Sequence, residues 1–182
     1  MCRYPYRHQT QDETDLEYGL RVANELEEEI INLGSENVMA FMAETVVGAT
    51  AGALTHVSGY FKRVREICDK YNVLLILDEV MCGMGRTGSL FACDDEDVVP
   101  DILTVAKGLG AGYQPIGAMI CQNFIYDAIA NGSGFFQHGH TYLGHPVACA
   151  ASLSVLNKLV NENFSSQVKE KGQYLQKNLE LH

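Results

Sequence analysis

Two ionisable residues stand directly after short apolar runs that resemble buried strands. Asp78 follows the run 73–77 (VLLIL), and Lys107 follows the run 102–106 (ILTVA). A carboxylate in such a place is costly to bury unless a cation meets it. A lysine there differs from an ordinary surface lysine, because partial desolvation would free its amine to act as a nucleophile. The positions therefore indicate a carboxylate and an amine that could share one site.

Three interpretations of Asp78 are open. It can be a structural carboxylate at a strand end, or the acidic end of a nucleotide-hydrolase strand. The second interpretation requires a G-x-x-x-x-G-K-[ST] loop, which this sequence lacks. In the third interpretation, the carboxylate faces a protonated pyridine nitrogen and keeps that ring able to accept electrons.

Lys107 is followed by glycines at 108, 110 and 112, which would let the backbone approach a ligand closely. This stretch does not complete a dinucleotide-binding loop, because Tyr113 stands where the last glycine is needed. Taken alone, Lys107 fits a surface or structural lysine. Taken together, Asp78 and Lys107 suit the two poles of one pyridoxal phosphate (PLP) ring.

Helical and strand patterns alternate around these residues. A capping box at Thr14–Glu17 predicts a helix that stops at Gly34. Its expected core positions are Leu16, Leu20, Ala23, Leu26 and Ile30. Further helices are expected from a cap at Ser58, over 123–130, from Pro146 to about 160, and over 165–179. Strands are expected over 38–43, 73–77, 102–106 and 116–121.

This alternation predicts an α/β fold, with a largely parallel sheet covered by helices on both faces. In such sheets functional groups gather at the carboxyl ends of the strands. Glu44, Asp78 and Lys107 all occupy such ends.

The composition is that of a soluble globular domain, with 47% hydrophobic and 20% charged residues. The net charge of -10 argues against nucleic-acid binding, and no apolar run is long enough to span a membrane. The six cysteines and six histidines form no metal-binding pattern, so no metal is expected. Cys68, Cys121 and Cys149 lie in apolar stretches and are expected in the core of a protein from a reducing compartment. The polar start has no signal peptide, which favours the cytoplasm, although a mitochondrial address on a longer N-terminus is compatible.

Three segments carry a family resemblance: LLILDEVMCGMGRTGSLFAC, VVPDILTVAKGLGAGYQPIGA and FFQHGHTYLGHPVACAASL. Together they resemble class III aminotransferases of PLP fold type I, over about residues 36–160. The resemblance implies that residues 1–35 lead into the core, that 36–160 form the PLP-binding core, and that 161–182 form a helix leading to a small domain. The chain therefore looks like a fragment from the middle of the large domain.

The resemblance also implies roles for individual residues. Asp78 matches the residue that pairs with the pyridine nitrogen, and Val80 matches the apolar residue against one ring face. Lys107 matches the lysine that forms the internal aldimine with PLP and moves the substrate proton. Thr141 matches the threonine that reaches the phosphate of the neighbouring subunit's cofactor in a homodimer. Glu44 matches a glutamate near the substrate pocket.

Other positions carry weaker implications. Met81 stands at a cofactor-binding position where some members have a glutamine that hydrogen-bonds the phenolic oxygen. Arg86, in the motif GRTG, is expected to shape the loop and subunit contacts. His138, His140 and His145 are expected to pack and hydrogen-bond near the subunit boundary and not to act as acids or bases.

The reaction implied is transfer of an amino group from an amino acid or amine to a 2-oxo acid. The run GLGAGYQPIGA leans towards ω-amino acids or amines, with pyruvate or 2-oxoglutarate as acceptor. Two alternatives stay open: another PLP enzyme on the same scaffold (an aminomutase, racemase or decarboxylase), or an inactive truncated chain with only an interaction role. The family's phosphate loop, stacking aromatic residue and substrate-binding arginine are not found among the 182 residues.

Overall fold

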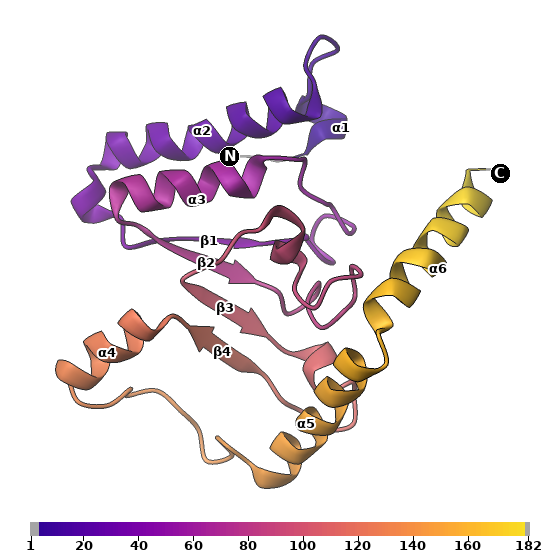
Figure 1. The fold of residues 1–182 in the computed structure, drawn as a ribbon. Coiled ribbons are helices and arrows are strands. Elements are labelled where there is room, and N and C mark those ends of the chain that lie inside the picture. Colours follow the sequence, from indigo (N-terminus) through magenta and orange to yellow (C-terminus); the bar gives the residue numbers. More distant parts are fainter. Residues whose placement is uncertain (1–3, 181–182) are drawn as a thin grey trace. The chain divides into compact units, whose positions relative to one another are not determined.

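The computed structural model describes residues 4–180, which form two compact units. The first unit contains the chain up to Asp78 together with Cys93–Leu103, and the second contains Glu79–Ala92 and the chain from Thr104 onwards. The outermost residues of the two end segments expected from the sequence, 1–3 and 181–182, lie outside the described part. Figure 1 shows the elements of both units.

The four strands are hydrogen-bonded in the order β1-β2-β3-β4. The strands are β1 (Ala40–Glu44), β2 (Leu74–Asp78), β3 (Ile102–Val105) and β4 (Ala118–Cys121). All four expected strands are present, with ends shifted by up to two residues. β1 and β2 are parallel, with Ala40 opposite Leu74 and Glu44 opposite Asp78. In Figure 1, the arrows of β3 and β4 point in opposite directions, so β4 is antiparallel. The sheet is therefore mixed but largely parallel.

Helices α2 (Asp15–Leu33) and α3 (Tyr60–Tyr71) lie side by side in the first unit, as Figure 1 shows. The predicted capping box at the start of α2 is confirmed, because the Thr14 hydroxyl accepts from Glu17 N–H and the Glu17 carboxylate accepts from Thr14 N–H. Ala23, Leu26 and Ile30 are buried as expected. The expectation was wrong for Leu16 and Leu20, which are 51% and 37% exposed. The buried face of the first turns instead carries Tyr18, Gly19 and Val22.

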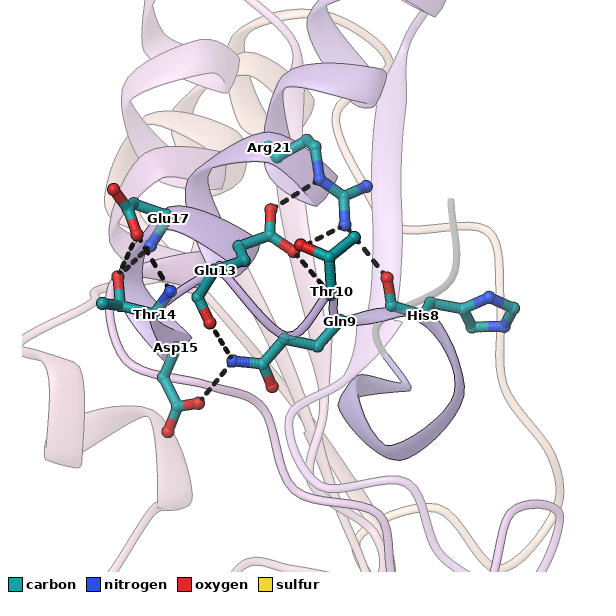
Figure 2. Close-up of polar contacts among 8 residues, drawn as sticks. All are labelled: His8, Gln9, Thr10, Glu13, Thr14, Asp15, Glu17 and Arg21. Atoms are coloured by element: carbon teal, nitrogen blue, oxygen red, sulfur yellow. Dashed lines mark hydrogen bonds and ion pairs between the residues drawn. The ribbon is translucent and has the colours of Figure 1, made fainter.

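The segment before α2 contains a four-residue helix, α1 (Pro5–His8), which the sequence pattern did not predict. Arg21 on α2 connects this segment to the helix (Figure 2). Its guanidinium donates to both carboxylate oxygens of Glu13, at 2.7 and 2.9 Å, and to the His8 carbonyl at 3.1 Å. The hydrogen bond from Arg21 lowers the pKa of the Glu13 carboxyl. Surface polar contacts therefore hold a segment that has no buried side chain in α1.

The start of α3 is capped from a distant part of the chain. Ser58 was expected to cap it, but the N-cap position is Gly59, which has no side chain to do so. Glu96, at the end of the 3-10 helix Ala92–Glu96, fills this role instead. Its carboxylate accepts from the N–H groups of Gly59, Phe61 and Lys62, the last two at 2.9 and 3.3 Å. A carboxylate at this end of a helix satisfies unpaired N–H groups and interacts favourably with the helix dipole.

Asp101 connects α3 to the sheet. One of its carboxylate oxygens accepts from Leu75 N–H on β2 at 2.6 Å and from the Arg65 guanidinium on α3 at 2.8 Å. Arg65 also pairs with Asp69, at 2.8 Å, but the Asp69 side chain is 67% exposed. Asp101 therefore joins one buried helix face to a central strand.

The second unit exposes more apolar surface than a covered sheet would. It contains β4, α4 (Asn123–Asn131), α5 (Pro146–Asn161) and α6 (Phe164–Leu179). Pro146 begins α5 as predicted. In β4, however, Met119 and Ile120 are about half exposed, so the expectation that helices cover both faces of the sheet fails at this strand.

The cysteines differ in burial. Burial raises the pKa of the Cys68 thiol to about 11, so this residue stays a neutral core thiol. Cys149 was expected in the core but lies on the exposed side of α5, since only Ala148 and Ser152 of that helix are buried. Cys121 is half-buried. Among the helices of residues 4–180, none is both long and apolar enough to cross a membrane.

We predict that Asp101→Ala lowers the free energy of unfolding by about 2–3 kcal/mol, because it leaves a backbone N–H and a half-buried guanidinium without their shared acceptor. Denaturant unfolding monitored by circular dichroism measures the loss. Asp69→Ala is the matched control, since it removes the exposed partner of the same arginine and should cost less than about 1 kcal/mol. Equal losses in both variants would contradict the role given to Asp101.

We predict that Glu27 makes stability depend on acidic pH. Its carboxylate accepts from Lys70 at 2.6 Å, Tyr71 at 3.0 Å and Arg63 at 2.7 Å. The hydrogen bond from Lys70 lowers its pKa most, and Tyr71 and Arg63 add to the effect, while burial opposes it. The stabilisation is therefore complete above the unfolded-state pKa of about 4.3 and is lost as the pH falls through the lower folded-state pKa.

Unfolding measured between neutral and strongly acidic pH should show a shallower acid slope in Glu27→Gln than in the wild type. Glu28→Gln removes the same charge from the exposed side of α2 and should keep the wild-type slope. A Glu27→Gln slope equal to that of the wild type would refute the prediction.

Candidate functional site

Two carboxylates lie side by side at the end of the sheet in the first unit. Glu44 and Asp78 are the last residues of β1 and β2, and the parallel register places them opposite each other. Paired residues of parallel strands project on the same face, about 4.8 Å apart along the sheet. Asp78 also fixes the next residue of β1, since its carbonyl accepts from Thr45 N–H at 3.3 Å. The register therefore places two carboxylate-bearing residues next to each other at this edge of the sheet.

Glu44 also shapes the loop that follows it. Its carboxylate accepts from Gly48 N–H at 2.8 Å, which turns the chain back towards the strand end. An antiparallel bridge between Val47 and Leu54 closes the loop. One oxygen of Glu44 is thus engaged in holding the backbone, while the side chain stays half-buried beside Asp78.

Lys107 begins a short 3-10 helix, Lys107–Leu109, in the second unit, two residues after the end of β3. Its backbone φ is 41°, in the left-handed region that favours glycine. Leu109 N–H donates to the Ala106 carbonyl at 2.8 Å, and Gly110 N–H donates to the Lys107 carbonyl at 3.1 Å. The side chain is exposed, so the expected partial desolvation is not found in this chain. Lys107 lies outside β3, in the turn that follows the strand.

The Lys107 side chain lines an open hollow of about 700 Å³. Arg86 lines the same hollow, together with Gln114 and the backbone of Gly108 and Gly112. Two cationic side chains and two glycines therefore border one space, which could take an anionic ligand. Arg86 was expected to shape the loop and subunit contacts, and its position beside the hollow of Lys107 was not predicted.

Val80 and Met81 lie in the turn that follows β2, and both are half-buried. The residue between Asp78 and Val80 is one that the sequence reasoning missed. Glu79 is 1% exposed, and its carboxylate accepts from Ala92 N–H at 2.7 Å. The available signal was a second acid directly after a buried strand, but sequence alone does not tell which of two adjacent acids faces inwards.

Thr141 lies in an exposed turn between α4 and α5. Leu143 N–H donates to the His140 carbonyl at 3.0 Å, and the His140 ring nitrogen Nδ1 accepts from Tyr142 N–H at 3.1 Å. His140 and His145 line a second hollow, of about 540 Å³. His140 thus makes a local hydrogen bond in an exposed turn, and the role expected of the three histidines at a subunit boundary stays a prediction. The hydroxyl of Thr141 stands on the surface of the unit.

The structure thus brings the predicted residues together in two groups. Glu44 and Asp78 share a strand register in the first unit. Lys107 and Arg86 line one hollow in the second unit. Val80, Met81 and Thr141 belong to the same unit.

Comparison with known proteins shows which family the chain resembles. Residues 1–182 match the family "Aminotransferase class-III". A protein from Gibberella zeae named "Aminotransferase" is 51% identical over 172 residues, which cover 94% of this chain and 34% of that protein. Gamma aminobutyrate transaminase 2 of Solanum lycopersicum is 40% identical, over 98% of this chain and 39% of its own length.

Solved structures show the same similarity. A thermostable (S)-enantioselective omega-transaminase from Thermomicrobium roseum superposes with a TM-score of 0.89 at 42% identity, over 96% of this chain and 38% of that one. An omega-aminotransferase from Paracoccus denitrificans has a TM-score of 0.90 at 34% identity, over 98% of this chain and 40% of its own. The chain therefore spans well under half the length of these relatives.

Proposed function

Because the chain belongs to the class-III aminotransferase family, we propose that the protein transfers an amino group from an amine or amino acid to a 2-oxo acid with pyridoxal 5'-phosphate. The observation that carries this proposal is the pair of strand-end features: a carboxylate cluster at Glu44 and Asp78, and an exposed amine at Lys107 beside a glycine-lined hollow. These are the two kinds of group that the poles of the cofactor ring require.

The residues present fit this cofactor. The hollow beside Lys107 is open, about 700 Å³ in volume, and bordered by the backbone of Gly108 and Gly112 and by Arg86. Its cationic lining suits an anionic ligand. When bound, pyridoxal 5'-phosphate supplies an aldehyde carbon that amines can join and a ring that accepts electrons.

Each residue would make one contribution. Lys107 would hold the cofactor through Nζ and, as a free amine, would take a proton from the substrate carbon and return it. Asp78 would hold the proton on the ring nitrogen by its charge, and Val80 would lie against one ring face. Met81 would neighbour the ring without donating a hydrogen bond. Thr141, exposed in its turn, would bind the phosphate of the partner subunit's cofactor in a homodimer.

The relatives suggest the donor class. One is named for gamma aminobutyrate, an amine distant from a carboxylate, and two solved structures are titled omega-transaminase or omega-aminotransferase. We therefore propose an ω-amino acid or amine as the donor and pyruvate or 2-oxoglutarate as the acceptor. Glu44 would lie on the substrate side of the site.

The direct test is borohydride reduction of the full-length protein with pyridoxal 5'-phosphate, followed by peptide mapping. We expect the pyridoxyl group on Lys107, and we expect Lys107→Ala to lose both the label and amino transfer. Lys62→Ala and Lys158→Ala are controls that should keep both. A label on another lysine, in a protein that still transfers amino groups, would refute the assignment.

Asp78→Asn should lower the rate of amino transfer by about 100- to 1,000-fold, because an amide cannot stabilise a protonated ring nitrogen as a carboxylate does. Steady-state kinetics with several amine donors measures the change, and circular dichroism checks that the fold is kept. Wild-type activity in folded Asp78→Asn would exclude this role for the carboxylate.

A further inference from the structure

We propose that Glu79 is a positioning residue for Lys107: its buried carboxylate fixes the loop 79–92, and this loop holds the turn that carries the lysine. The inference rests on the proposed function of Lys107 as the cofactor lysine. All the residues involved belong to the second compact unit.

The first step is the anchoring of the loop at Glu79. Its carboxylate accepts from Ala92 N–H at 2.7 Å, so one side chain joins the first and last residues of the loop. Its own N–H donates to the Thr104 carbonyl on β3 at 2.9 Å. A carboxylate that is 1% exposed is costly unless such hydrogen bonds compensate the loss of water. Glu79 is thus fixed to β3 by its backbone and to the loop end by its side chain.

The second step is the tight turn inside the loop. Gly83 N–H donates to the Glu79 carbonyl at 2.9 Å. A Cβ atom at Gly83 would lie 2.8 Å from that carbonyl oxygen and 3.2 Å from the Glu79 Cβ, so glycine is required for this approach. The N–H groups of Met84 and Gly85 both donate to the Leu90 carbonyl, at 2.8 and 3.3 Å. The backbone at Met84 is therefore held from both sides of the loop.

The third step is the contact between the loop and the lysine turn. A Cβ atom at Gly108 would lie 2.7 Å from the Met84 Cβ and 3.6 Å from the Gly83 carbonyl oxygen. The Met84 side chain thus packs directly on Gly108, the residue that follows Lys107, and the Gly83 carbonyl lies beside it. Met84 is itself 7% exposed and has a φ of 60°, so its position is imposed by the loop and not by its own preference.

The fourth step is the strain at Lys107. A non-glycine residue in the left-handed region costs about 1–2 kcal/mol, and such a conformation persists only where the surroundings impose it. The Lys107 side chain is exposed, so its own packing cannot impose the φ of 41°. The Met84–Gly108 contact is the tertiary constraint next to it. Contacts therefore run from the Glu79 carboxylate through the loop to Gly108, the residue bonded to Lys107.

The first experiment compares Glu79→Ala and Glu79→Gln in the full-length protein. Hydrogen exchange without cofactor should show the Ala92 amide exchanging at least about tenfold faster in Glu79→Ala, with partial recovery in Glu79→Gln, which keeps an oxygen acceptor. With pyridoxal 5'-phosphate, the rate of borohydride-trapped labelling of Lys107 should fall by about tenfold in Glu79→Ala. In Glu79→Gln the rate should recover in part.

Glu96→Ala is the matched control, because Glu96 is also a carboxylate that accepts backbone N–H groups, but in the first unit. It should lower stability without changing the labelling rate of the folded protein. Unchanged labelling in folded Glu79→Ala, or an equal fall in folded Glu96→Ala, would overturn the positioning role.

A second experiment decides the matter even if Glu79→Ala does not fold. Gly108→Ala places a methyl group against the Met84 Cβ and should slow the labelling of Lys107 by about tenfold or more. Met84→Gly removes the colliding atom at a φ that glycine accepts, so the double variant should recover most of the rate. A double variant as slow as Gly108→Ala would overturn the inference.

If the wild type itself carries no label on Lys107, the proposed function fails and the positioning role with it. A labelled wild type with unaffected variants refutes the positioning role alone.

Discussion

Hydrogen bonds from backbone N–H groups to half-buried or buried carboxylates hold the loops and helix ends of this protein in place. Glu44 accepts from the loop after β1, Glu96 from the start of α3, Asp101 from β2, and Glu79 from the end of its own loop. A carboxylate can satisfy several N–H groups that no regular structure would pair, and each such bond is stronger than a neutral one. The acidic composition is thus partly a structural resource.

Two adjacent acidic residues at the end of β2, Asp78 and Glu79, differ in burial and in contacts. Asp78 is the last residue of β2 and is half-exposed, while Glu79 follows the strand and is buried. The register sets Asp78 beside Glu44, and the buried Glu79 carboxylate closes a loop. The two adjacent acids therefore have different surroundings: Asp78 ends the strand in register with Glu44, and Glu79 holds the loop that follows.

The sequence predicted the elements better than their contacts. The capping box at Thr14 and the proline at the start of α5 are local signals, and both are confirmed because the interactions span three or four residues. The cap of α3 was missed because its carboxylate comes from Glu96, 35 positions beyond Phe61, and no local pattern encodes that pairing. The burial of Tyr18 in place of Leu16 in the first turns of α2 has a related cause. The elements packed against a helix decide which of its residues are buried, and local sequence does not specify those elements.

The site was predictable to a similar degree. The positions of Glu44, Asp78 and Lys107 near strand ends follow from apolar runs that stop at a charge, and the parallel pairing of β1 with β2 follows from the α/β pattern. The exposure of Lys107 was not predictable, because it depends on where β3 stops and on the turn that follows.

Local backbone rules are broken around the hollow of Lys107. Lys107 and Ala111, which both line it, have φ values of 41° and 47°, and Met84, which packs on Gly108, has a φ of 60°. None of the three is a glycine, so each conformation costs free energy that contacts elsewhere must offset. The neighbouring glycines at 83 and 108 permit the close packing that supplies those contacts. Lys107 thus occupies a backbone conformation that is unfavourable for a non-glycine residue. Such strain is expected where the position of a side-chain amine is constrained by function.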